Sequence, residues 1–175
     1  SSDVCSSDLD DIYLERYQKE LEQIQPVSDT TRAYLLINIV EDNDKESLKL
    51  LSESYLGKIV GWVEPFRCRG VLAADLVQES NLSMMAYIGQ RQWLNNYEWK
   101  DKIKEGTTED LIQVLNEIDN EVKYQAEESM RMLIDEQMDS NKISGKVLNK
   151  VNYVNDWAVR LKEELGRKQI GRAHV

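Results

Sequence analysis

Few side chains in this sequence could carry covalent or metal chemistry. Two cysteines and one histidine occur among 175 residues, too few for the clusters that hold zinc. No Gly-rich phosphate loop is present. The many carboxylates leave acid pairs such as Glu127 and Asp135, which share a helix face with Arg131 between them. Such a group is either solvated surface or an acid–base or metal site, and surface is favoured. We therefore expect no enzyme, no metal, no cofactor and no small-molecule substrate.

The coding sequences of the two ends of the chain can be reverse complements of each other. One coding of residues 170–175 is ATC GGA AGA GCA CAC GTC, and its reverse complement translates as residues 3–8 in order. A natural gene has no physical reason for this relation, and the string looks like a common sequencing adapter. We therefore expect residues 1–9 and 169–175 to be translated adapter. The natural part would then be an internal fragment, residues 10–168.

This interpretation removes the histidine and one of the cysteines. His174 and Cys5 fall in the adapter-derived ends, so the remaining fragment has no base for a Ser-His-Asp or Cys-His device. Cys68 is then the only cysteine, and we expect a small, buried or half-buried, apolar side chain there. A single cysteine fits a reduced, cytoplasmic setting.

The composition favours one helical domain. The hydrophobic content of 41% is too high for a disordered chain, and two prolines with eight glycines supply few turns for an all-β fold. No apolar run is long enough to span a bilayer. The net charge of −10 argues against binding duplex DNA by charge alone, because phosphate contacts need clustered Lys and Arg. We expect an all-α protein outside the membrane.

Apolar residues recur at spacings of three and four, which is typical of amphipathic helices. The long face in the second half carries Leu111, Leu115, Ile118, Val122, Ala126, Met130 and Leu133. Asn43 with Glu46 forms a capping-box pattern that predicts a helix start. The helices predicted in this way cover residues 10–25, 30–40, 44–63, 72–88, 107–138 and 147–165. Other boundary signals are Pro26, Ser28, Pro65, Gly70 and the Thr107–Asp110 pair.

The predicted helix at residues 72–88 has two unlike faces. One face is made for packing and carries Leu76, Val77, Ser80, Met84, Tyr87 and Ile88. The other mixes acidic and polar residues with two large apolar ones, namely Asp75, Gln78, Glu79, Leu82 and Met85. A polar face that exposes Leu and Met is typical of a partner-binding surface. The alternative is an ordinary amphipathic helix with scattered apolar residues.

A family resemblance bears on this choice. Residues 75–82, Asp-Leu-Val-Gln-Glu-Ser-Asn-Leu, resemble the Asp-Leu-Ile-Gln-Glu-Gly-Asn-Ile/Leu motif of the bacterial RNA polymerase sigma-70 family. Other segments that resemble the family follow in the right order: residues 12–26, 43–44, 51–60, 69–71, 151–152 and 161–167. The resemblance implies a sigma region 2-like helical bundle at 10–104, an acidic helix at 105–140 and the start of region 3 at 141–168.

The resemblance also implies a partner. In this family the matching helix docks on the clamp helices of the β′ subunit of core RNA polymerase. The residues that match the docking surface here are Asp75, Gln78, Glu79, Asn81, Leu82 and Met85. The implied function is a cytoplasmic bacterial transcription initiation factor that directs promoter-specific initiation.

The promoter-recognition part of the family departs most here. The family's aromatic Phe-Ser-Thr-Tyr-Ala and Trp-Trp-Ile-Arg patterns are missing, and residues 104–137 are acidic instead. An acidic helix repels single-stranded DNA. The residues that combine aromatic and basic character are Arg91, Trp93, Tyr97, Trp99 and Lys100. They either contact promoter DNA or fill the core. The alternatives to an initiation factor are a polymerase-binding regulator that has lost promoter melting and a helical scaffold without a polymerase role.

Overall fold

The fold is built from helices alone in the part of the chain that the computed structural model describes, residues 8–139 and 160. The α-helices are α1 (Asp8–Leu21), α2 (Asp29–Asp42), α3 (Lys45–Glu53), α4 (Leu56–Val63), α5 (Ala73–Met84), α6 (Tyr97–Glu105) and α7 (Thr108–Asp139). The all-α prediction is confirmed for these residues. The predicted region 3-like segment at 141–168 lies outside them except for residue 160, as do the predicted adapter ends except for residues 8 and 9. No described helix combines the length and apolarity needed to cross a membrane.

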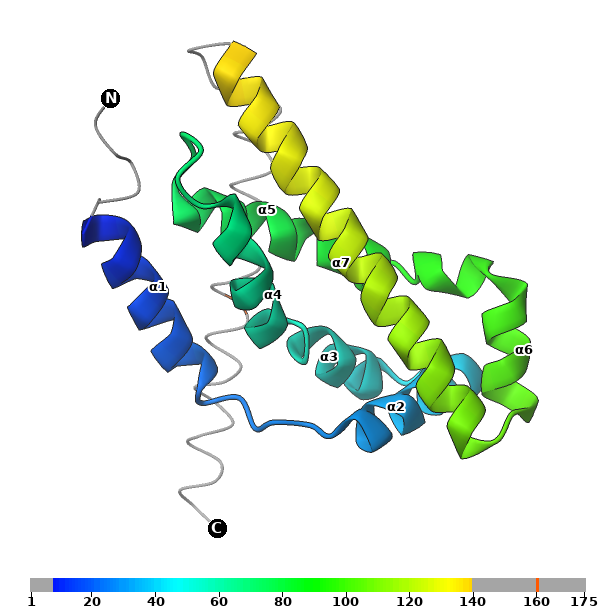
Figure 1. The fold of residues 1–175 in the computed structure, drawn as a ribbon. Coiled ribbons are helices and arrows are strands. Elements are labelled where there is room, and N and C mark those ends of the chain that lie inside the picture. The colour runs from blue at the N-terminus through cyan, green and yellow to red at the C-terminus, as the bar shows by residue number, and fades with distance from the viewer. Residues whose placement is uncertain (1–7, 140–159, 161–175) are drawn as a thin grey trace.

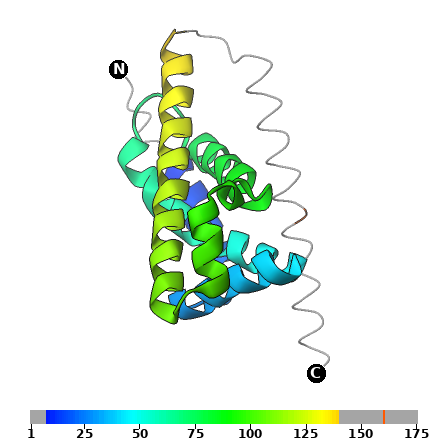
Figure 2. The ribbon, with the colours of Figure 1, turned by 90° about the vertical axis from the view of Figure 1, so that its right-hand side faces the viewer.

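Helix α7 is the longest helix among the described residues (Figure 1). It starts beside α6 and packs on α2, α4 and α5. All seven apolar positions predicted for its inner face are buried, because a spacing of three and four keeps them on one side of a long helix. Figure 2, turned by 90°, shows α5 lying against α7. Residues 105–139 therefore share one hydrophobic core with residues 10–104.

The single helix predicted for residues 44–63 is two helices, α3 and α4, with a break at Ser54 and Tyr55. The Ser54 hydroxyl donates to the carbonyl of Leu51 and accepts the Nε–H of Arg32 at 2.9 Å. A serine side chain that binds a backbone carbonyl competes with the helical ladder. One apolar face continues across the break, since Leu51, Tyr55, Ile59 and Val63 are all buried.

The capping box predicted at Asn43 and Glu46 is wrong by one residue. Asn43 ends α2 in the left-handed conformation, with φ of 52°, which asparagine tolerates better than most residues. The N-cap residue of α3 is Asp44, whose carboxylate accepts the Ser47 side-chain hydroxyl at 2.6 Å and makes no side-chain cap hydrogen bond. Ser28 does cap α2, as predicted, by accepting the backbone N–H of Thr31 at 3.2 Å.

The connection between α4 and α5 turns sharply. Pro65 lies in the short 3-10 helix Glu64–Phe66 that follows α4, and Gly70 takes a φ of 85°, so both predicted boundaries are confirmed. The prediction for Cys68 is wrong. This residue is exposed, has a φ of 71° and is disulfide-bonded, so it gives no support to the expected reduced setting.

Candidate functional site

Helix α5 and the π-helical turn that continues it, Met85–Gly89, carry the candidate site. The residue before the helix, Leu72, supplies no side-chain cap. A buried carboxylate from α1 takes that role, because Oδ1 of Asp10 accepts the backbone N–H of Ala73 at 3.2 Å. A carboxylate at a helix N-terminus satisfies a free donor and complements the helix dipole. Asp10 of α1 therefore caps the first turn of α5.

The two faces of α5 are arranged as its sequence predicts. All six predicted packing residues are buried, and all but Tyr87 are 0% exposed. The opposite face is partly exposed and brings together five of the six predicted docking residues: Asp75, Gln78, Glu79, Leu82 and Met85. Their spacing of three and four aligns them along one side of the helix.

Asn81 lies apart from the other five predicted docking residues. It is only 3% exposed, because it faces α1 at the flank of α5. Its Nδ2 donates to the hydroxyl of Tyr17 at 3.1 Å, and its Oδ1 has no hydrogen-bond partner within the described residues. In this arrangement Asn81 does not reach the surface. The spacing of residues along α5 could not reveal that a separate helix covers it.

The surface of α5 is acidic and partly dehydrated where α1 approaches it. Burial raises the pKa of Asp75, and the nearby carboxylate of Asp10 raises it further. On α1, the rings of Tyr13 and Tyr17 stack with centroids 5.9 Å apart, and burial raises the pKa of both phenols. The surface thus presents carboxylates beside apolar side chains, which suits a basic partner with an apolar centre.

The predicted nucleic-acid cluster is divided by the fold. Trp93 is 1% exposed, with its Nε1–H donated to the carbonyl of Ile88 at 3.3 Å, so it belongs to the core. Trp99 is half-buried, and its indole N–H donates to Glu117 of α7 at 2.6 Å. Tyr97 is 77% exposed. The two bases predicted with them, Arg91 and Lys100, are partly exposed. Of the three aromatic residues, Tyr97 is the one that points to solvent.

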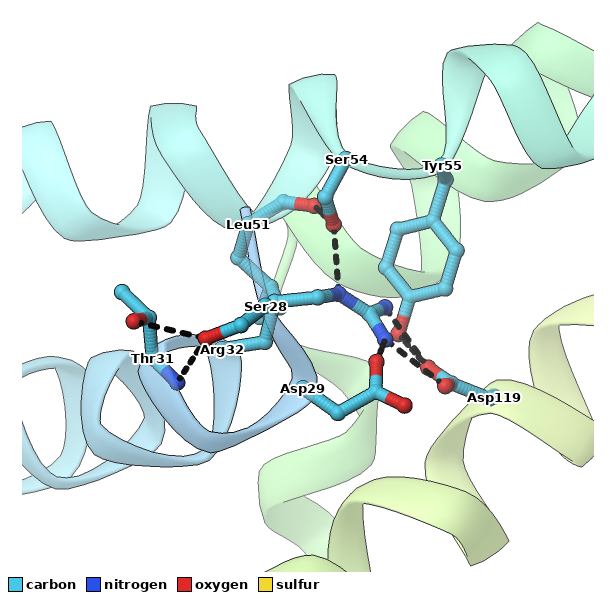
Figure 3. Close-up of polar contacts among 8 residues, drawn as sticks. All are labelled: Ser28, Asp29, Thr31, Arg32, Leu51, Ser54, Tyr55 and Asp119. Carbon is cyan, nitrogen blue, oxygen red and sulfur yellow. Dashed lines mark hydrogen bonds and ion pairs between the residues drawn. The ribbon is translucent and has the colours of Figure 1, made fainter. Parts of the chain in front are cut away.

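A buried ionic network joins three parts of the bundle (Figure 3). Arg32 of α2 is 1% exposed and makes two hydrogen bonds to the Asp119 carboxylate of α7, at 2.9 and 2.8 Å. The Tyr55 hydroxyl donates to the same carboxylate at 2.6 Å, and Asp29 binds the guanidinium at 3.2 Å. Burial and the Asp119 charge raise the pKa of Tyr55 well above its usual range. The sequence carries no signal for this network, whose main partners lie 87 positions apart.

No family model, curated protein or solved structure matches this chain. The resemblance to the sigma-70 family therefore rests on the sequence segments quoted above. Within the described residues, no three His, Cys, Asp or Glu side chains are grouped to hold a metal ion. The exposed face of α5 remains the surface on which the sequence pattern and the geometry agree.

Proposed function

We propose that this chain is a sigma-70-like transcription initiation factor that binds core RNA polymerase through the exposed face of α5 and directs promoter-specific initiation. One observation carries the proposal. The segment that resembles the family's docking motif forms a single helix, and five of its matching residues lie on the partly exposed side. Its remaining apolar residues lie in the core, so the helix is held rigidly behind its exposed face.

The chemistry of this face fits the clamp helices of the β′ subunit as a basic partner. Asp75 and Glu79 supply negative charge, and Gln78 supplies both a donor and an acceptor. Leu82 and Met85 supply apolar area, which a charged contact needs around it to exclude water. The net charge of −10 adds long-range attraction to a basic surface.

The proposal is tested by measuring binding of the full chain to purified bacterial core RNA polymerase. The double variant Asp75→Ala with Gln78→Ala should bind more weakly, by roughly 1–2 kcal/mol for each residue if both lie near the centre of the interface. A matched control is Asp101→Ala with Gln113→Ala, an exposed acid and amide on α6 and α7. The control should bind as the parent does. Equal binding by all three proteins would reject the docking role of α5.

The limited accessibility of the aromatic residues favours a second function, that of a polymerase-binding regulator without promoter melting. Flipped bases need accessible rings to stack on. Trp93 is enclosed and Trp99 is tied to Glu117, which leaves Tyr97 as the accessible ring of the cluster. Open-complex formation by the reconstituted holoenzyme, assayed over a library of bacterial promoter fragments, separates the two functions. Opening of any promoter supports the initiation factor, and polymerase binding without opening supports the regulator.

A further inference from the structure

Helix α1 is attached to the bundle less firmly than the helices it touches. Of its 14 residues, Asp10 and Leu14 are buried, whereas 12-residue α5 buries six. Figure 1 shows α1 at the edge of the bundle, where it packs on α4 and α5. Beyond the Asp10 cap on α5, its polar contacts with the bundle include the ion pair from Asp11 to Arg67 at 2.7 Å and the Tyr17–Asn81 hydrogen bond. Local opening free energy follows buried apolar contact, so α1 should open before the core does.

A groove separates the end of α1 from α4. It encloses about 300 Å³ beside Gly57, between α4 and the connection that contains Ile24 and Pro26, and it continues along α4 past Gly61. A Cβ atom added at Gly57 or Gly61 would meet no other atom within 4 Å. Because dispersion attraction needs atoms in contact, this half of α1 gains little from α4.

In its present position α1 removes polar groups of α5 from water. Helix α1 encloses Asn81 and leaves the amide oxygen of that residue without a hydrogen-bond partner. It also places the carboxylate of Asp10 close enough to raise the pKa of Asp75. An enclosed acceptor without a hydrogen bond is unfavourable, and so are two carboxylates in a dehydrated site. Both penalties disappear when α1 moves away.

We propose that α1 is a displaceable cover on the docking face of α5, and that full engagement of core RNA polymerase requires α1 to leave Asn81. This inference rests on the proposed function, because it assumes that α5 is the docking element. Opening exposes the one matching docking residue that the closed arrangement hides. The apparent dissociation constant then equals that of the open form divided by the open fraction. Substitutions that loosen α1 should tighten binding, and substitutions that fasten it should weaken binding.

The test uses the full chain and purified bacterial core RNA polymerase. Tyr17→Phe removes the hydroxyl that holds Asn81 but keeps the aromatic ring, and it should bind roughly fivefold more tightly. Gly61→Leu fills the groove and should bind more weakly. Tyr34→Phe, which removes the hydroxyl of an exposed tyrosine on α2, is the matched control and should leave binding unchanged. Unchanged or weaker binding by Tyr17→Phe would overturn the proposal that α1 is a displaceable cover.

A second measurement needs no polymerase. In native-state hydrogen exchange, amides in the middle of α1 should exchange at least roughly tenfold faster than those in the middle of α7, through local opening. Gly61→Leu should slow exchange in α1 and leave α7 unchanged. Equal protection of the two helices would overturn the cover whatever the polymerase results. If α1 opens as described but Asp75→Ala with Gln78→Ala binds polymerase normally, the docking role fails, and the inference that depends on it fails as well.

Discussion

Replacing Asp119 should lower the free energy of unfolding, because its carboxylate is the centre of the buried ionic network. Its carboxylate accepts two hydrogen bonds from Arg32 and one from Tyr55, and so joins α2, the α3–α4 junction and α7. In Asp119→Ala, the guanidinium stays buried over the Tyr55 ring, with Ser54 at 2.9 Å and Asp29 at 3.2 Å as its remaining hydrogen-bond partners. The side chain of Asp29 is 63% exposed, so its charge is screened by water and compensates poorly.

The magnitude follows from the burial of Arg32. Removing one partner of a buried ion pair costs about 3–5 kcal/mol, because an unpaired charge is left behind. Two milder variants calibrate this figure. Tyr55→Phe removes one hydrogen bond and keeps the ion pair, for a loss of about 1–2 kcal/mol. Asp29→Ala removes an exposed partner and should cost no more than about 1 kcal/mol. The expected order of destabilisation is therefore Asp119→Ala, then Tyr55→Phe, then Asp29→Ala.

Urea unfolding near neutral pH, followed by far-ultraviolet circular dichroism, measures these differences as free energies of unfolding. A decisive control is the double variant Arg32→Met with Asp119→Leu. Replacing both charges with apolar groups of similar size is often neutral or stabilising, so the double variant should recover most of the loss. A loss below about 1 kcal/mol for Asp119→Ala would refute the reasoning. A double variant as unstable as the single one would refute it equally.

Three further predictions concern single positions. Gly106→Ala should destabilise the fold in urea, because its Cβ would lie 2.2 Å from a backbone carbonyl oxygen of α6 and the α6–α7 connection would have to shift. Burial raises the pKa of Asp75, so its favourable contribution exists below the unfolded pKa and is lost as pH rises through the folded one. Asp75→Asn should therefore resist urea better than the parent near neutral pH, with the difference vanishing in acid. Burial also raises the pKa of Tyr87 to about 12 from a usual 10.0. The parent should lose stability above the usual value, and Tyr87→Phe should lose less in an alkaline titration followed by circular dichroism.

The long helices were predictable because their apolar spacing leaves few alternatives. In α7, the Thr107–Asp110 pair marks the start and forms both reciprocal hydrogen bonds, at 3.0 and 3.2 Å. The predicted inner face of that helix is buried throughout. The two-sided character of α5 was predictable for the same reason, since a period of 3.6 separates core from exterior positions along any helix.

Features that depend on distant neighbours were not predictable. Ser54 breaks a helix by binding a carbonyl, and its position in the sequence gives no sign of this. Asn81 and Asp75 lie on the same helix, but a separate helix covers Asn81 far more completely. The Arg32–Asp119 pair spans 87 positions. Periodicity reports the face of a residue relative to its own helix, whereas these outcomes depend on what packs against that face.

The acidity of α7 and the limited accessibility of Trp99 are linked in the structure. Glu117 belongs to the acidic helix α7, and its carboxylate accepts the indole N–H of Trp99 at 2.6 Å. The helix that would repel single-stranded DNA therefore also withdraws an aromatic ring from it. Because α7 shares a core with α5, these acidic residues cannot move away without disturbing α5. A chain that initiates transcription with this architecture would have to hold promoter DNA through the exposed Tyr97 and the nearby Lys100. Loss of promoter opening in Tyr97→Ala with polymerase binding intact is the result that this reasoning requires of an initiation factor.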